Sequence, residues 1–202
     1  ITLTNPSQTD AEGNKRGFSI SSAPYEDTIT ITTRMRDTAF KRVLKSEPLG
    51  TSATIEGPFG EMTLHADAAR PAVLLTGGIG VTTFRSILLQ AAHENLPHRI
   101  ILFYSNRRPE DAAFLAELEA LQQTNPNYQL VATMTDMKDS EQLWAGETGK
   151  IDAELLAKYD DVTKNGIFYI TGPPGMVKGL QSVLAGIGVH SEDIRVEEYT
   201  GY

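Results

Sequence analysis

Residues 74–84 read LLTGGIGVTTF, and this stretch decides the fold. An apolar run stops at glycines, and a helical pattern starts directly afterwards. That order is typical of a buried strand, a tight turn and the N-terminus of a helix, where unpaired backbone N–H groups can bind an anion such as phosphate. Glycine allows the sharp turn and lets a ligand approach without meeting a Cβ. The stretch therefore predicts a phosphate-binding loop at the carboxyl end of a strand.

The composition is that of an acidic chain of 202 residues with a formal net charge of −8 and no cysteine. Nucleic acids and anionic membrane surfaces bind basic proteins, so we expect neither as a partner. Without cysteine the chain cannot form a disulfide or hold a cysteine-ligated iron–sulfur cluster. The four histidines are scattered, which predicts no metal site, and no apolar run approaches membrane-spanning length. We expect a cytoplasmic protein, and the strand-like opening at Ile1 indicates a fragment of a longer chain.

A change in sequence pattern divides the chain into two parts, residues 1–68 and residues 69–202. The first part is β-rich around Ile20, Thr28–Thr33 and Thr54–Glu56, and one short helix over 39–45 interrupts it, with Thr38 as its N-cap. The second part alternates strands and helices, which predicts a five-stranded parallel sheet with helices on both faces. The predicted strands are 72–76, 99–105, 128–134, 166–171 and 194–197, and the predicted helices are 81–94, 110–122, 152–158 and 175–186.

A second stretch with chemistry is residues 15–24, KRGFSISSAP. On a strand Arg16 and Phe18 point to the same face, where an arginine can bind phosphate oxygens and an aromatic ring can stack on a flat heterocycle. Ser19 can exchange a hydrogen bond with a ring nitrogen. These residues suit a phosphorylated planar cofactor such as a flavin. Taken alone, the stretch favours the alternative of an ordinary strand with an exposed arginine and a core phenylalanine.

Two further stretches are less specific. Residues 34–45 carry five basic side chains in an acidic chain, a pattern that fits phosphate binding, docking of an acidic partner or a solvated face. Residues 169–176, YITGPPGM, form another strand–turn–helix pattern, although an ordinary helix start explains the prolines equally well. The common dinucleotide fingerprint is excluded, because residues 78–83 lack its third glycine and no ribose-binding acid follows the second strand.

Together the four stretches resemble the ferredoxin–NADP reductase superfamily, most closely its stand-alone bacterial flavin/NAD(P)H reductase modules. The resemblance spans nearly the whole chain in the right order. It implies a partial antiparallel β-barrel that binds flavin over residues 1–68, with two strands before Ile1 missing. It implies an NAD(P)-binding α/β domain with a five-stranded parallel sheet over residues 69–202.

Residues 16–19 match the family's Arg-x-Tyr-Ser flavin motif, with phenylalanine replacing tyrosine. The resemblance implies that Arg16 holds a flavin phosphate, that Phe18 stacks on or beside the ring system, and that Ser19 lies near its N5 atom. The other flavin contacts that it implies are Ile20, Ser21, Arg34, Thr38, Gly57 and Gly60.

In the second domain residues 76–82 match the pyrophosphate loop for a nicotinamide nucleotide, with Thr83 in place of the family's usual proline. Residues 171–174 match the nicotinamide-side loop, where many members carry cysteine instead of Thr171. The nucleotide contacts implied by the resemblance are Thr76, Gly77, Gly78, Gly80, Val81, Thr82, Asp136, Thr171, Gly172, Pro173 and Tyr199. The catalytic residues implied by the resemblance are Ser19, Glu197 and Tyr199.

We therefore expect a flavin-dependent NAD(P)H oxidoreductase that uses FAD in preference to FMN. It would pass a hydride from nicotinamide to flavin, and electrons onward to a ferredoxin-like protein, an oxygenase component or a small acceptor. Asp136 would repel a 2′-phosphate and so favours NADH over NADPH, whereas Arg107, Arg108 or Lys138 could reverse that preference. The alternatives are a non-catalytic nucleotide-binding or regulatory module that has lost flavin, and an interaction protein that binds neither ligand.

Overall fold

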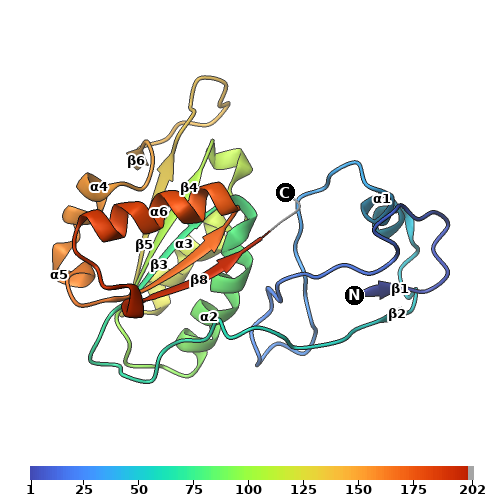
Figure 1. Cartoon of the computed structure of the whole chain (residues 1–202), viewed down its shortest axis with the longest axis horizontal. Coiled ribbons are helices and arrows are strands. Elements are labelled where there is room, and N and C mark those ends of the chain that lie inside the picture. The colour runs from blue at the N-terminus through green and yellow to red at the C-terminus, as the bar shows by residue number, and fades with distance from the viewer. Residues whose placement is uncertain (200–202) are drawn as a thin grey trace.

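The computed structural model describes residues 1–199, in which an α/β unit lies beside a loop-rich N-terminal unit (Figure 1). The α/β unit contains one parallel sheet with the strand order β6-β5-β4-β3-β7-β8. Its strands are β3 (Ala72–Gly77), β4 (Ile100–Asn106), β5 (Tyr128–Met134), β6 (Glu147–Thr148), β7 (Ile167–Gly172) and β8 (Ile194–Glu198). The chain order reverses between β3 and β7, and α/β sheets bind ligands at such a point.

All five strands predicted for this sheet are confirmed to within one residue at each end. The predicted strand number is nevertheless wrong, because the described residues form six strands. The additional strand, β6, is only two residues long and pairs with Thr133 and Met134 at the end of β5. Two residues are too few to produce the alternating pattern from which a strand is predicted.

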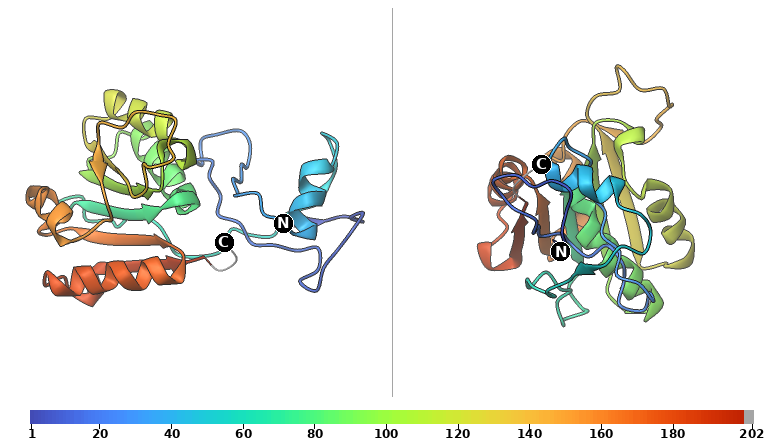
Figure 2. Two further views of the ribbon diagram at one scale, coloured as in Figure 1. Left: turned by 90° about the horizontal axis from the view of Figure 1, so that it is seen from above. Right: turned by 90° about the vertical axis from the view of Figure 1, so that its right-hand side faces the viewer.

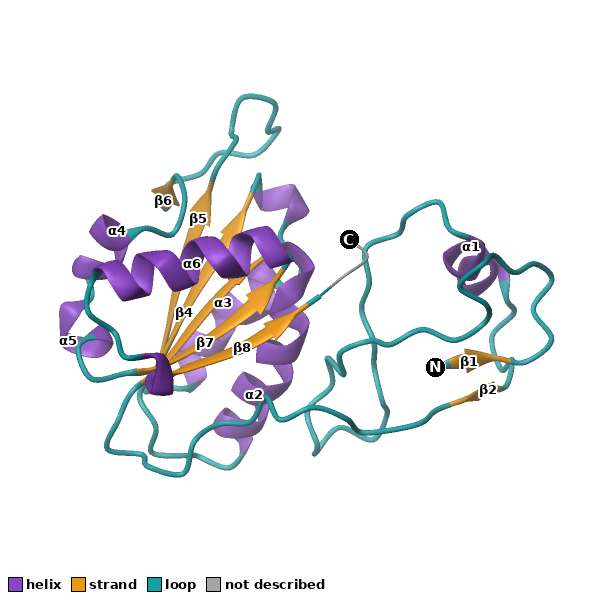
Figure 3. Cartoon of the chain, in the orientation of Figure 1, coloured by secondary structure: helices purple, strands orange, loops and turns teal. Residues whose placement is uncertain are grey.

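Helices cover both faces of the sheet (Figure 3). The helices are α2 (Val81–His93), α3 (Leu115–Thr124), α4 (Ala153–Ala157), α5 (Asp160–Thr163) and α6 (Pro174–Gly186), with 3-10 turns at Gly78–Gly80, Pro109–Asp111 and Ser191–Asp193. Leu74 and Leu102 pack with α2 and α3, whereas Val73 and Phe103 pack with α4, α5 and α6. Successive residues of a strand point to opposite faces, so a sheet covered on both sides needs continuous apolar strands.

Two helix predictions require correction. The helix predicted over 110–122 begins only at Leu115, because Pro109–Asp111 forms a separate 3-10 turn and Phe114 has a left-handed backbone with φ of 61°. The Phe114 ring lies 5.0 Å from the Arg85 guanidinium, a tertiary contact that the helical pattern does not encode. The helix predicted over 152–158 is confirmed as α4, but α5 follows it and is not predicted.

The N-terminal unit is less regular than the sequence predicts (Figures 2 and 3). Its helix α1 (Ala39–Ser46) is confirmed, and the Thr38 hydroxyl caps it by accepting the Lys41 N–H at 3.3 Å. Its sheet is small, since only β1 (Thr2–Leu3) and β2 (Ala53–Thr54) pair as antiparallel strands within the described residues.

The β-rich stretch over 28–33 forms only a single bridge, between Ile20 and Ile31. Of the β-rich stretch over 54–56, only Thr54 belongs to a strand, β2. Ile29 and Ile55 are therefore 59% and 54% exposed. A strand is stable only when neighbouring strands or a helix satisfy its edges, and these segments have few such neighbours within the described residues.

A hydrogen-bonded histidine fastens the segment that enters the α/β unit. The His65 N–H and Nδ1 both contact the Tyr169 hydroxyl, at 2.8 and 2.9 Å, and Nε2 lies 2.9 Å from the Arg70 carbonyl oxygen. These partners fit a neutral ring in which Nε2–H donates to Arg70 and Nδ1 accepts from Tyr169. Burial lowers the pKa of His65, and the nearby His98 and Arg195 lower it further.

We predict that this contact makes folding stability depend on pH. The pKa of His65 is lower in the folded chain than its ordinary value of about 6.5, so protonation favours the unfolded chain. The stabilisation is complete above about pH 6.5 and is lost as the pH falls through the folded-state pKa. The free energy of unfolding, measured in urea from pH 8 to pH 5, should therefore fall more steeply for the native chain than for His65→Gln. His190→Gln, which replaces an exposed histidine, is the control, and equal pH slopes for all three chains would contradict the prediction.

Candidate functional site

The glycine loop lies at the carboxyl end of β3 and leads directly into α2. Gly78 has a φ of +54°, which few residues other than glycine adopt without strain. A Cβ on Gly77 would lie 2.6 Å from the Met176 sulfur, and a Cβ on Gly80 would lie 2.8 Å from the Thr76 hydroxyl oxygen. No side chain caps the start of α2. The loop is therefore packed tightly on the sheet beneath it while the helix N-terminus keeps backbone donors for an anion.

Two buried threonines join this loop to the neighbouring strand. The Thr171 hydroxyl donates to the Gly80 carbonyl oxygen at 2.9 Å and lies 2.8 Å from the Thr76 hydroxyl. The Thr76 hydroxyl in turn donates to the Thr171 carbonyl oxygen at 3.1 Å. Both side chains are fully buried. Thr171 thus supports the glycine loop from below.

Three residues that the resemblance implies as catalytic lie together at this edge of the sheet. The Tyr199 hydroxyl donates to a Glu197 carboxylate oxygen at 3.0 Å and forms a hydrogen bond with the Thr83 hydroxyl, and the Ser19 side chain interacts with the same phenol. The Tyr199 N–H donates to the Gly172 carbonyl oxygen at 3.0 Å, which fixes the tyrosine beside the loop that precedes α6. Burial raises the pKa of Tyr199 to about 12, and the Glu197 carboxylate contributes to the rise. The phenol therefore stays protonated at neutral pH.

Other predicted residues border the same corner. Arg34 comes from the N-terminal unit, and its guanidinium lies 3.4 Å from the position that a Cβ of Gly78 would take. A Cβ on Gly60 would lie 4.0 Å from the Glu197 carboxylate, so the loop that starts at Gly57 also reaches this region. The remaining predicted loop residues lie at helix N-termini. Val81 and Thr82 are the first residues of α2, and Pro173 is the N-cap of α6.

The residues predicted to hold the flavin phosphate and ring form a separate group around α1. The Arg16 guanidinium lies 2.8 Å from an Asp10 carboxylate oxygen and 3.0 Å from one of Glu12. The Phe18 ring packs on Phe40, with 5.8 Å between ring centroids. In this structure the Arg16 guanidinium is therefore paired with carboxylates of the chain, and the Phe18 ring packs against another ring of the chain.

Two residues that follow the flavin motif differ in their surroundings. Ile20 is 37% exposed and forms the bridge to Ile31. Ser21 is fully buried, and its hydroxyl donates to the Thr30 carbonyl oxygen at 3.1 Å. The Ser21 side chain therefore supports the local backbone.

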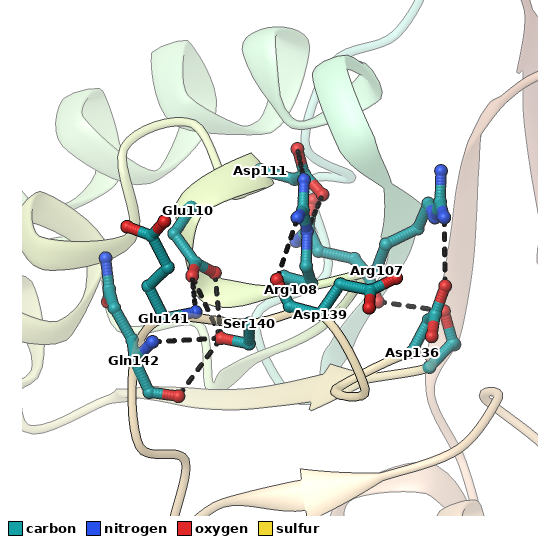
Figure 4. Close-up of polar contacts among 11 residues, drawn as sticks. Arg107, Arg108, Glu110, Asp111, Asp136, Asp139, Ser140, Glu141 and Gln142 are labelled. Atoms are coloured by element: carbon teal, nitrogen blue, oxygen red, sulfur yellow. Dashed lines mark hydrogen bonds and ion pairs between the residues drawn. The ribbon is translucent and has the colours of Figure 1, made fainter.

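Asp136 follows β5, which lies two strands from β3 in the sheet, and its carboxylate faces Arg107 (Figure 4). Its carboxylate accepts a hydrogen bond from Arg107 at 2.9 Å, and this contact lowers the pKa of Asp136 below its ordinary value. Arg108 is paired with Asp111 at 3.1 Å. Both arginines that could attract a 2′-phosphate are thus engaged by carboxylates.

Comparison with known proteins now identifies the family. Residues 74–182, more than half of the chain, match the family described as "Oxidoreductase NAD-binding domain", and the chain belongs to that family. The fold is that of the ferredoxin–NADP reductase superfamily. The ferredoxin–NADP+ reductase from Plasmodium falciparum aligns with a TM-score of 0.68 at 16% identity, covering 96% of this chain and 80% of that one.

Two curated relatives are similar in sequence. Reductase component 2 of terephthalate 1,2-dioxygenase from Comamonas is 23% identical over 93% of this chain and 56% of the relative. One component of the Na+-translocating NADH-quinone reductase from Methylococcus capsulatus is 31% identical over 75% of this chain and 38% of the relative. The chain thus spans about half the length of the curated relatives it matches.

Two other kinds of feature are absent from the described residues. No helix within residues 1–199 is both long and apolar enough to cross a membrane. No group of three or more His, Cys, Asp or Glu side chains in that range is arranged to hold a metal ion.

The sequence does not predict the contacts that Arg85 makes between distant parts of the chain. Its side chain, only 12% exposed, contacts α3 and the N-terminal unit at once. Helical periodicity places residue 85 on α2 but carries no information about partners far away in the chain. An arginine close to an apolar helix face is the only signal that could have found it.

We predict that Gly80→Ala destabilises the folded chain. The added methyl group would lie 2.8 Å from the Thr76 hydroxyl oxygen and 3.1 Å from the Thr171 carbonyl oxygen, so one loop must move. Such overpacking costs about 1–3 kcal/mol. Thermal or urea unfolding measures the change, and Gly179→Ala, which adds a methyl group in open space within α6, is the matched control. The control should be neutral or stabilising by up to about 1 kcal/mol. Equal stability of the two variants would refute the close packing.

Proposed function

We propose that the chain is the FAD- and nicotinamide-binding part of an NAD(P)H-dependent oxidoreductase that passes electrons to a separate acceptor. The observation that carries the proposal is the meeting of Ser19, Glu197 and Tyr199 beside the glycine loop. Ser19 comes from the N-terminal unit and the other two from the end of the α/β unit, so the corner is built by both parts of the chain. The family to which the chain belongs supports this assignment.

The nicotinamide nucleotide would lie along the carboxyl edge of the sheet. The start of α2 offers backbone donors to the pyrophosphate, and Arg34 adds a positive charge beside Gly78. Gly77 and Gly80 let the loop pack closely on Met176 and on the Thr76–Thr171 pair, and Gly78 adopts the positive φ of the turn, so the loop can lead into α2 with its backbone donors facing a ligand. Gly172 and Pro173 would border the nicotinamide end, where Tyr199 and Glu197 meet Ser19.

The flavin would occupy the side of the N-terminal unit. A phosphate would bind Arg16 by displacing the Asp10 and Glu12 carboxylates, which its guanidinium contacts in this structure. Phe18 would border the ring system, and Ser19 would lie at the junction with Tyr199. FAD supplies a ring that accepts a hydride from the reduced nicotinamide when both are bound.

The protein groups at the junction orient the ligands. Tyr199 stays protonated at neutral pH and holds the Glu197 carboxylate, while Ser19 and Thr83 fix the phenol oxygen. This arrangement requires no general acid–base pair, because hydride transfer depends chiefly on holding two rings in register.

The acceptor would be a ferredoxin-like protein, an oxygenase component or a small molecule. These 202 residues contain no cysteine, so a cysteine-ligated iron–sulfur cluster would belong to another protein or domain. One relative is the reductase component of a dioxygenase and another is part of an NADH-quinone reductase, which supports electron transfer to a separate group. A cytoplasmic location stays part of this proposal.

A second candidate is a nucleotide-binding or regulatory module without flavin. The contacts of Arg16 with Asp10 and Glu12, and of Phe18 with Phe40, favour it, because the chain's own groups already satisfy these side chains.

A visible absorption spectrum separates the two candidates. We predict that the purified chain, supplied with FAD, retains flavin absorption bands after gel filtration and that anaerobic NADH bleaches them. Arg16→Ala should weaken FAD binding about tenfold or more, since it removes charge-assisted hydrogen bonds worth about 1.5–3 kcal/mol. Lys15→Ala, which removes a neighbouring charge paired with Glu56, is the control. A colourless chain that still binds NADH would establish the module instead.

Asp136 gives a prediction about the choice of coenzyme. The carboxylate repels a 2′-phosphate and also occupies Arg107, so Asp136→Ala both removes the repulsion and frees a cation. The ratio of kcat/KM for NADH to that for NADPH should fall about tenfold or more, which corresponds to about 1.4 kcal/mol. Steady-state reduction of an artificial acceptor with each coenzyme measures it. Asp139→Ala, in the same loop, should leave the ratio within about twofold. A native preference for NADPH would contradict the role of Asp136.

A further inference from the structure

Arg85 on α2 connects three segments that are distant in sequence. Its guanidinium binds both Glu117 carboxylate oxygens at 2.7 Å, through Nε and Nη2. Its Nη1 donates to the Ser21 carbonyl oxygen at 2.6 Å and to a Glu26 carboxylate oxygen at 3.2 Å. The side chain is only 12% exposed and lies over the Phe114 ring. Every nitrogen of this guanidinium therefore has a partner.

We propose that Arg85 is a positioning residue that holds the Ser19–Ser22 segment against α2 and thereby sets the distance between the flavin and nicotinamide sites. The proposal rests on the function proposed above. Its contact partner Ser21 is two residues from Ser19, which reaches the Tyr199 hydroxyl. Arg85 itself lies near the start of α2, the helix whose N-terminus adjoins the glycine loop.

Two other contacts along α2 also hold this part of the N-terminal unit against the helix. The Ser86 hydroxyl donates to the Ser22 carbonyl oxygen at 2.8 Å, so consecutive residues of α2 hold consecutive carbonyl groups of the segment. At the last residue of α2, the His93 ring stacks on the Tyr25 ring with 4.1 Å between centroids. Helix α2 thus holds the Ser19–Ser22 segment at Ser21 and Ser22 and the following residues at Tyr25, and Arg85 supplies the charged contact.

Because of the charges around Arg85, its removal should displace the Ser19–Ser22 segment further than the loss of a single contact would. Glu117 and Glu26 face the guanidinium from α3 and from the N-terminal unit, and both raise the pKa of Arg85. The pKa of Glu26 is lowered chiefly by the hydrogen bond from the Ala23 N–H and, to a smaller extent, by Arg85. This carboxylate therefore stays charged. Without the guanidinium two carboxylates would face each other across the junction, and their repulsion would push the segment away from α2.

The expected consequence is a loss of rate with little loss of binding. The glycine loop and the Thr76–Thr171 contacts do not involve Arg85, so the coenzyme keeps its site. Transfer between two rings depends steeply on their separation, and a displacement of about 1 Å can cost on the order of 100-fold in rate.

The test is stopped-flow reduction of the full chain loaded with FAD, over a series of NADH concentrations. Arg85→Met should lower the limiting rate of flavin reduction by about tenfold to 100-fold, with an NADH dissociation constant within about threefold of the native value. Arg85→Lys keeps the positive charge but cannot bind both Glu117 carboxylate oxygens with two nitrogens, so its limiting rate of flavin reduction should lie between those of the native chain and Arg85→Met. Arg70→Met is the matched control, because Arg70 makes a comparable set of bonds to Asp193, Asn165 and Gly166 away from the junction. It should keep the native rate.

Hydrogen exchange provides a second readout that does not depend on flavin. Amide protons of residues 19–26 should exchange faster in Arg85→Met than in the native chain, while those of β3 and β4 stay unchanged. If Arg85→Met does not fold, Arg85→Lys and Glu26→Gln must show the same two effects to a smaller extent.

Three results would overturn the proposal: a native reduction rate in Arg85→Met, an equal loss in Arg70→Met, or a slow Arg85→Met whose residues 19–26 exchange normally. A native chain that binds no FAD would refute the proposed function instead. In that case unchanged exchange in Arg85→Met would also refute the attachment of the segment.

Discussion

The parallel pairing of β3 with β4 on one side and β7 on the other is the constraint on which the site depends. Leu75 pairs with Phe103 and with Ile170, so the three central strands run in register to the same edge. Each strand then ends in a polar or glycine-containing segment, and only this pairing brings the glycine loop and the loop after β7 together. The Thr76–Thr171 contacts add side-chain hydrogen bonds at the last paired position, which makes the two loops one unit.

Helix α2 carries this constraint into the N-terminal unit. Its first turn adjoins the glycine loop, Arg85 and Ser86 hold the Ser21 and Ser22 carbonyl groups, and Thr83 reaches Tyr199. The N-terminal unit has little regular structure of its own, as Figure 3 shows, so these contacts define where its residues lie near the site. A small antiparallel sheet and a three-residue core are weak sources of order beside the buried sheet of the α/β unit.

Much of the α/β unit could be predicted from sequence because its strands and helices have long, distinct patterns of apolar residues. The elements that the sequence does not predict, β6 and α5, are too short to produce a pattern. The late start of α3 coincides with the left-handed Phe114, whose ring contacts Arg85. The meeting of Ser19, Glu197 and Tyr199 came from the family resemblance, since no local pattern joins residues so far apart. Their roles at a bound cofactor stay a prediction.

Two departures from the family's pattern are explained by hydrogen bonds that this chain makes. Thr83 replaces the usual proline after the glycine loop, and its hydroxyl contacts Tyr199, which a proline could not do. Thr171 replaces a common cysteine, and its hydroxyl supports the Gly80 carbonyl group, for which a thiol is a weak donor. A third departure, Phe18 in place of tyrosine, packs its ring within the N-terminal core without needing a partner for a hydroxyl. The two threonines therefore add side-chain hydrogen bonds within the corner, to Tyr199 and to the Gly80 carbonyl group, and these bonds hold its loops together.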